Sequence, residues 1–201
     1  MRFLAGLLGP LVLAALAMAA PARAQPPGAT HHVQAQLVAD SLGVTPGQTI
    51  HVALRQRIES HWHTYWRNSG DSGEPTRIKW DLPAGWQAGD FTWPTPRRIA
   101  VGPLMNYGYE GEVLLPIALT APATARPGEQ MTLKARASFL VCAEICVPED
   151  ADLSLALPVT AAAAPPDPKW GAAIAQTLAA APKPAGLAAV FQPRPAGVAL
   201  A

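Results

Sequence analysis

An alternation of apolar and polar residues with a period of two recurs along the chain, and it constrains the fold more than any other feature. In residues 50–59, apolar side chains alternate with His51, Arg55 and Arg57. A strand with this pattern buries one face and exposes the other. The other segments with the same pattern are Val33–Val38, Val113–Leu119, Met131–Val141 and Leu153–Val159.

Turn-forming residues separate these segments. The turn signals are Thr45–Gly47, Asn68–Gly73, Leu82–Gly85 and Arg126–Gly128. Proline contributes 22 of the 201 residues, which disfavours a helical body, and half of the residues are hydrophobic, which excludes a disordered polar chain. Several short strands divided by turns predict an all-β fold, an immunoglobulin-like β-sandwich.

The first residues have the features of a secretory signal. Arg2 and Arg23 bracket a short apolar stretch, which is followed by Ala22-Arg23-Ala24. We expect cleavage before Gln25 and export, with an uncleaved membrane anchor as the alternative. Removing residues 1–24 takes two arginines from a net charge of +1 and leaves −1. A near-neutral chain without a Lys/Arg cluster gives no sign of nucleic-acid binding.

A change of composition after Val159 predicts a domain boundary. Residues 160–168 are rich in alanine and proline, which cannot continue a central strand. We therefore expect a redox domain over residues 25–160, followed by a linker and tail over 161–201, the tail being either a linker or the start of a further domain. Within the tail, Lys169–Ala181 predicts one short helix, with Trp170, Ile174 and Leu178 spaced four apart.

The only two cysteines, Cys142 and Cys146, lie between two predicted strands. In an oxidising compartment such a pair can form a disulfide. Four residues apart on one extended strand their Cα atoms would lie about 13 Å apart, whereas a disulfide needs less than about 7 Å. A three-residue turn over 143–145 would bring them face to face, so a bond requires that turn.

Three roles for the pair stay open on spacing alone. Closing a loop of about five residues stabilises a fold by only about 2 kcal/mol, so the bond is an inefficient staple. Thiol–disulfide exchange and metal binding are the other two roles. Glu144 and Glu149 flank the cysteines and would oppose thiolate formation if they were close, so we expect no strongly lowered cysteine pKa.

The metal hypothesis adds two histidines. His61 and His63 would lie on one face of an extended segment, and with Cys142 and Cys146 they would make a set suited to copper or zinc, with Met105 as a further copper ligand. The other interpretation is an aromatic-rich strand with no ligand role.

The segment formed by Met105, Asn106, Tyr107, Gly108 and Tyr109 precedes the strand that begins near Val113. Two tyrosines around a glycine predict a tight loop tip. Such a tip is either an ordinary turn with buried rings or a cap that limits access to the cysteine pair.

Several of these segments together resemble one known family. The matching stretches are Trp62–Trp66, Gly70–Gly73 with Pro75 and Thr76, Trp80–Pro83, Trp93–Pro94, Tyr107–Glu110 and Cys142–Glu149. Over most of residues 30–160 the chain resembles the periplasmic N-terminal domain of DsbD-type thiol:disulfide interchange proteins, particularly their ScsB-like branch.

The resemblance implies a periplasmic immunoglobulin-like domain with a redox cysteine pair on a hairpin. It implies a protein-disulfide reductase of the kind that serves cytochrome c biogenesis, with no cofactor and no small-molecule substrate. Electrons would come from a membrane-embedded or thioredoxin-like donor and pass to periplasmic thioredoxin-like oxidoreductases or isomerases. Cys146 would form the mixed disulfide, Cys142 would resolve it, and Met105–Tyr109 would match the cap.

The chain departs from that family in three respects. The best-known members space their cysteines more widely, and Ser69 stands where a proline is expected. The membrane-embedded and thioredoxin-like parts are not in these 201 residues. The chain is then either a part or short variant of a longer protein, or a separate domain that receives electrons from another protein.

Overall fold

The computed structural model describes residues 31–183, 191–194 and 197–200, so the predicted signal segment and its cleavage before Gln25 lie outside the described residues. The strands are β1 (Val33–Ala39), β2 (Thr49–Ile58), β3 (Thr64–Gly70), β4 (Arg77–Asp81), β5 (Gln87–Phe91), β6 (Arg97–Val101), β7 (Leu104–Tyr109), β8 (Glu112–Thr120), β9 (Gln130–Cys142), β10 (Cys146–Pro158), β11 (Phe191–Arg194) and β12 (Gly197–Leu200). The one helix among these residues is α1 (Gly171–Ala180).

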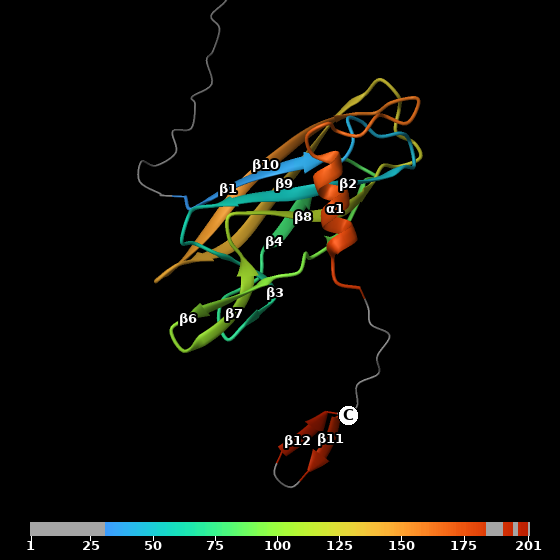
Figure 1. The fold of residues 1–201 in the computed structure, drawn as a ribbon. Coiled ribbons are helices and arrows are strands. Elements are labelled where there is room, and N and C mark those ends of the chain that lie inside the picture. The colour runs from blue at the N-terminus through green and yellow to red at the C-terminus, as the bar shows by residue number, and fades with distance from the viewer. Residues whose placement is uncertain (1–30, 184–190, 195–196, 201) are drawn as a thin grey trace, which may run out of the picture. The chain divides into compact units, whose positions relative to one another are not determined.

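Two antiparallel sheets pack face to face and form the body of the protein (Figure 1). One has the strand order β1-β2-β8-β5 and the other β10-β9-β4. Their inner faces share one apolar core, in which Val52 and Leu119 of the first sheet pack with Leu133 and Leu157 of the second. The predicted immunoglobulin-like β-sandwich is confirmed.

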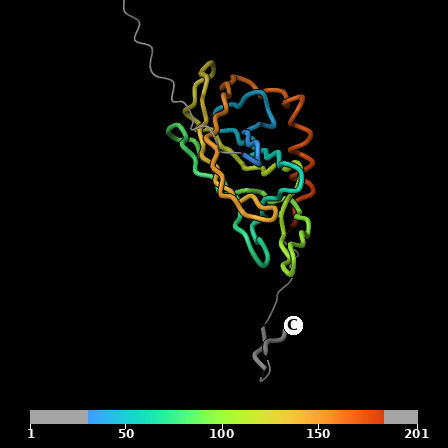
Figure 2. Tube along the Cα trace, turned by 90° about the vertical axis from the view of Figure 1, so that its left-hand side faces the viewer, coloured from blue at the N-terminus to red at the C-terminus, as the bar shows by residue number. Residues whose placement is uncertain are grey.

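A third, smaller sheet with the order β3-β7-β6 lies beyond one end of the two main sheets (Figure 1, Figure 2). The chain enters it after a turn in which His61 adopts a φ of 70°. Thr64 of β3 pairs with Tyr109 of β7, and a hairpin joins β7 to β6. The small sheet lies on the side of the sandwich where the long β9–β10 hairpin turns.

The β9–β10 hairpin carries the cysteines to that end. Its two strands have 13 residues each and pair without interruption from Gln130 with Pro158 to Cys142 with Cys146. The period-two pattern of β9 extends along the whole strand, so its inner side chains hold the register in the core. The turn therefore has a fixed place relative to the sandwich.

The predicted short helix is present as α1. The side chain of Asp167 stabilises the turn that leads into it by accepting hydrogen bonds from the backbone amides of Lys169 and Trp170, both at 2.8 Å. Ile174 is fully buried and packs against Val38 of β1, Ala53 of β2 and Leu114 of β8. Residues beyond 160 thus contribute to packing on the body.

The strands β11 and β12 form a two-stranded antiparallel hairpin in the tail. The predicted division into a domain over 25–160 and a tail over 161–201 remains a prediction. Within the described residues, no helix is both long enough and apolar enough to cross a membrane.

Candidate active site

Cys142 and Cys146 form a disulfide across the β9–β10 turn. Their Cα atoms lie 4.1 Å apart, and they are directly opposite in the strand register. The amide of Ala143 donates a hydrogen bond to the carbonyl oxygen of Ile145 at 2.9 Å and closes the turn. The predicted three-residue turn is therefore what permits the bond.

The two sulfur-bearing residues differ in accessibility. Cys142 is only 2% exposed, because it ends β9 inside the core, whereas Cys146 lies in an exposed position. Ile145, beside Cys146, is 67% exposed, unusually high for a large apolar side chain. Thiol–disulfide exchange requires in-line approach to a sulfur, so Cys146 is the residue that an incoming thiol can reach.

The strand β3 flanks the pair. The backbones of His63 and Cys142 exchange two hydrogen bonds, at 2.9 and 3.0 Å, so β3 is fixed beside the end of β9. On the same strand, the hydroxyl oxygen of Tyr65 lies 3.9 Å from Cys146 Sγ and 3.2 Å from Nε2 of His63. A phenol thus lies next to the accessible sulfur, and an imidazole contacts that phenol.

Burial determines the charge of both groups. It raises the pKa of Tyr65, and a hydrogen bond with Ser72 opposes this rise. It lowers the pKa of His63, with the Glu110 carboxylate opposing. At neutral pH the phenol therefore keeps its proton and the imidazole is uncharged.

A loop over Gly70–Gly73 holds the Tyr65 ring in place. A Cβ at Gly73 would lie 2.2 Å from two ring carbons of Tyr65, so the backbone packs directly on the ring. The loop is tied to β7, because the backbone amide and hydroxyl of Ser72 both donate to the Asn106 side-chain oxygen, at 3.0 and 3.1 Å. The segments Gly70–Gly73 and Asn106–Tyr109 thus jointly fix the phenol.

The predicted cap segment has a different local structure from the one expected. Met105, Asn106, Tyr107, Gly108 and Tyr109 are part of strand β7 and do not form a loop tip. The turn lies earlier, where Gly102 adopts a φ of 58° and leads into Pro103. The physical reason is that glycine followed by proline ends a strand, whereas the glycine at 108 allows two strands to approach closely.

A groove with a volume of about 680 Å³ opens beside the cysteine turn. One side is formed by the turn, Ala143–Ile145, and the other by Ile99–Val101 of β6. His61–His63 and Glu110 complete the lining. Of the β6–β7 hairpin, it is therefore β6 that faces the turn across this groove.

Most of the described chain matches a known protein family. A family model described as "Thiol:disulfide interchange protein DsbD, N-terminal" matches residues 31–158. The chain belongs to the DsbD N-terminal family. No curated protein sequence matches the chain.

Two crystal structures are similar to this member of the family. The N-terminal periplasmic domain of ScsB from Proteus mirabilis has a TM-score of 0.61 and 22% identity, covering 85% of this chain and 64% of that one. The Neisseria meningitidis DsbD N-terminal domain in the reduced form has a TM-score of 0.36 and 17% identity, covering 63% of this chain and 86% of that one. The first likeness supports the fold. This chain thus spans less than two thirds of the ScsB structure.

The proposed metal set is assembled only in part. His63 does lie beside Cys142, a proximity that the spacing of the motifs does not reveal. His61 and His63 are not on one strand face, however, because His61 is in the turn before β3. Across residues 31–183, no three His, Cys, Asp or Glu residues are grouped so that they could hold a metal ion.

The two flanking glutamates have different environments in this DsbD-family domain. Glu149 is 6% exposed and accepts hydrogen bonds from the amides of His32 at 2.7 Å and Val33 at 3.3 Å. His32 is accordingly packed, with its ring stacked on Trp62, and is not part of a solvated tail as its position near the start suggests. Glu144, by contrast, is exposed and lies in the turn itself, two residues before Cys146.

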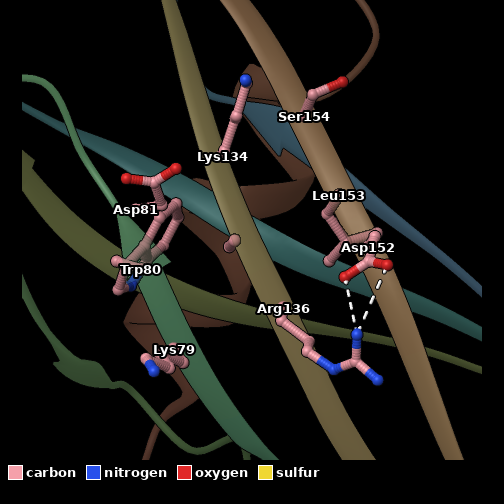
Figure 3. A pocket seen from close by; sticks show the side chains of 9 residues that line it. Lys79, Trp80, Asp81, Lys134, Arg136, Asp152, Leu153 and Ser154 are labelled. Atoms are coloured by element: carbon pink, nitrogen blue, oxygen red, sulfur yellow. Dashed lines mark hydrogen bonds and ion pairs between the residues drawn. The ribbon is translucent and has the colours of Figure 1, made fainter.

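A second groove, of about 450 Å³, lies on the β4-β9-β10 sheet (Figure 3). Lys79, Asp81 and Lys134 line it, and Arg136 is paired there with Asp152 at 3.2 Å. None of the turn residues Ala143–Ile145, which join the two cysteines, lines this groove, whereas all three line the first one. The groove beside the β9–β10 turn is therefore the candidate site.

The sequence predicted the cysteine pair but missed Tyr65 and Gly73 as parts of the site. Tyr65 was visible only as one aromatic residue in Trp62–Trp66. The sequence feature that could have indicated them is the aromatic segment Trp62–Trp66 followed closely by the glycine-rich segment Gly70–Gly73.

Proposed function

We propose that this chain relays electrons in the periplasm by thiol:disulfide exchange at Cys142 and Cys146. It would take electrons from a membrane-embedded or thioredoxin-like donor and reduce thioredoxin-like oxidoreductases or isomerases. The observation that carries the proposal is the unequal exposure of the two cysteines in a pair beside an open groove. A purely structural bridge does not need one accessible sulfur, whereas exchange does.

The exchange proceeds in two sulfur displacements. In the reduced protein, the Cys146 thiolate attacks a partner disulfide, forms a mixed disulfide, and releases one partner sulfur as a thiolate. The Cys142 thiolate then attacks Cys146 Sγ, restores the Cys142–Cys146 bond and releases the second partner thiolate. Two electrons pass to the partner within the sulfur bonds, so the reaction needs no organic cofactor.

Access to the pair would be limited by the β6–β7 hairpin. The family resemblance implies this role for Met105–Tyr109, which form most of β7. We extend the cap to β6, because Ile99–Val101 line the groove opposite the cysteine turn. Docking of a partner would then require the hairpin to move away from the turn.

Single-cysteine variants test the assignment of roles. Purified Cys142→Ser should form a stable mixed disulfide with a thioredoxin-like partner that carries one active-site cysteine, because nothing resolves it. Cys146→Ser should form none, since its remaining sulfur is buried. Equal trapping by both variants, or by neither, would overturn the proposed roles.

A further inference from the structure

Among the residues that the structure describes, Tyr65 is the one whose side chain is within hydrogen-bonding distance of the reacting sulfur, Cys146 Sγ. We propose that the Tyr65 hydroxyl donates a hydrogen bond to Cys146 Sγ when this sulfur is a thiolate, and so positions and stabilises the nucleophile. The inference rests on the proposed function, because it assigns a role in the same exchange. Tyr65 is a positioning residue in this account.

The geometry places the donor in a fixed orientation. Tyr65 is 1% exposed, and its hydroxyl oxygen lies 3.9 Å from Cys146 Sγ. The ring cannot move toward the loop, since a single added carbon at Gly73 would already lie 2.2 Å from it. A donor that is held in place before the reaction loses little entropy when the charge forms.

The Tyr65 hydroxyl has one proton, and besides Ser72 it has two neighbours that can accept it, His63 and Cys146. In the oxidised protein Cys146 Sγ is a disulfide sulfur and a weak acceptor, so Nε2 of the neutral His63, at 3.2 Å, is the better one. In the reduced protein a Cys146 thiolate carries a full negative charge. The proton then turns to the sulfur, and His63 in its Nε2–H form can donate to the phenol oxygen.

The surrounding charges make this donor important. The ionisable groups that face Cys146 or its groove are Tyr65 of β3, His61 and His63 just before this strand, Glu110 after β7 and Glu144 in the turn. The two carboxylates disfavour a thiolate, and burial lowers the pKa of His63, so its imidazole is uncharged at neutral pH. Tyr65 is then the donor that offsets the carboxylates without adding a charge.

The bonds in the step are those of ordinary exchange. The Cys146 thiolate uses its electron pair to form the bond to a partner sulfur, while the partner disulfide breaks and its second sulfur leaves with the other pair. The Tyr65 proton stays on the phenol oxygen throughout. Its hydrogen bond weakens as the charge leaves Cys146 and re-forms when the protein is reduced again.

The test measures the Cys146 thiol in the Cys142→Ser background, with iodoacetamide alkylation rates recorded from pH 6 to pH 10. Adding Tyr65→Phe removes only the hydroxyl and leaves the ring on Gly73. We expect the pH midpoint to rise by about one unit and the rate at pH 7 to fall about tenfold. An unchanged midpoint would overturn the inference, whatever the rate.

A matched control is Tyr109→Phe in the same background. Its hydroxyl donates to the Pro94 carbonyl oxygen at 2.8 Å, so it is a second buried phenol of the same small sheet with a different acceptor. The thiol midpoint should stay where it is in the parent. If both variants raised the Cys146 midpoint equally, the cause would be a general change in the small sheet, and a specific hydrogen bond from Tyr65 would be refuted.

Biosynthetic replacement of tyrosine by 3-fluorotyrosine gives a measurement that does not depend on folding of the Tyr65→Phe variant. The more acidic phenol is a stronger donor, so the Cys146 midpoint should fall. No shift, or a rise, would contradict the inference. These readouts use a small reagent, so failure of partner exchange would refute the proposed relay and leave the Tyr65 result to stand by itself.

Discussion

The sandwich core and the small β3-β7-β6 sheet are built from different kinds of residues. The core between the main sheets is mostly apolar, with Leu54, Leu115 and Ile117 fully buried. Around the small sheet, buried positions are occupied by polar side chains such as His63 and Asn106. Apolar packing is non-directional, whereas buried polar groups need specific partners.

One chain of hydrogen bonds shows what this difference provides. Thr64 donates to the Gln56 side-chain oxygen at 2.9 Å, and the Gln56 amide donates to the Thr76 hydroxyl at 3.2 Å. These bonds attach β3 to the sandwich in one orientation, and β3 carries Tyr65 to the cysteines. The core thus supplies stability, and the polar contacts supply the geometry of the site.

The largest expected effect tests the core. Leu54→Ala should lower the free energy of unfolding by about 2–5 kcal/mol, because it removes buried methyl groups and leaves a cavity. Urea denaturation measures this loss. The reduction rate of the disulfide in the folded fraction should not change; a large change would mean that core and site are not separable as described.

Gly108→Ala should act on the site with a smaller loss of stability. The added Cβ would lie 2.0 Å from the Thr64 carbonyl oxygen, so β7 must move away from β3. We expect about 1–3 kcal/mol of destabilisation and faster reduction of the disulfide by dithiothreitol. Two control variants separate the clash from other effects of an added methyl group. Gly89→Ala adds the methyl group without a clash, because the nearest atom is 3.7 Å away. Gly111→Ala adds only backbone strain, because its φ is +70° and no atom lies within 4 Å.

Thr64→Val tests the polar attachment of β3. It keeps the shape of the side chain but leaves the Gln56 oxygen without its donor, at an expected cost of about 1–3 kcal/mol. The double variant Thr64→Val with Gln56→Leu should recover part of this loss. Additive losses in urea denaturation would argue against a coupled network.

His63 makes the free energy of unfolding depend on pH. Its folded-state pKa is lowered by burial, so the unfolded chain takes up a proton at higher pH than the folded protein does. The contribution is therefore present above about pH 6.5 and is lost as the pH falls toward the lowered pKa. His63→Phe should flatten the decline of the urea midpoint between pH 7.5 and 5.5, and an unchanged slope would contradict this.

The smallest effect is expected on the charged outer face of the β4-β9-β10 sheet (Figure 3). Arg136 is paired with Asp150 at 3.0 Å and Asp152 at 3.2 Å, but all three are exposed. Exposed pairs of this kind contribute little. Arg136→Ala should leave both the urea midpoint and the rate of disulfide reduction close to the parent values, and a clear loss of either would give this face a role.

The same contrast explains what could be predicted from the sequence. Period-two alternation reports which face of a strand is buried, so the sandwich and the β9–β10 register followed from it. The place of β3 depends on contacts between Thr64 and Gln56 and on backbone pairing of His63 with Cys142, which have no periodic signal. For the same reason the sequence predicts a loop tip where β7 is a strand, since Gly108 meets the Thr64 carbonyl only in the folded structure.

The central claim is that the Cys142–Cys146 bond is exchangeable, and its equilibrium reduction potential tests this most directly. The purified chain would be equilibrated with glutathione or dithiothreitol mixtures and the reduced fraction read by thiol alkylation. The account predicts a potential above about −250 mV, in the range of disulfides that exchange with protein partners. A potential below about −300 mV would mark a structural bridge and contradict the account.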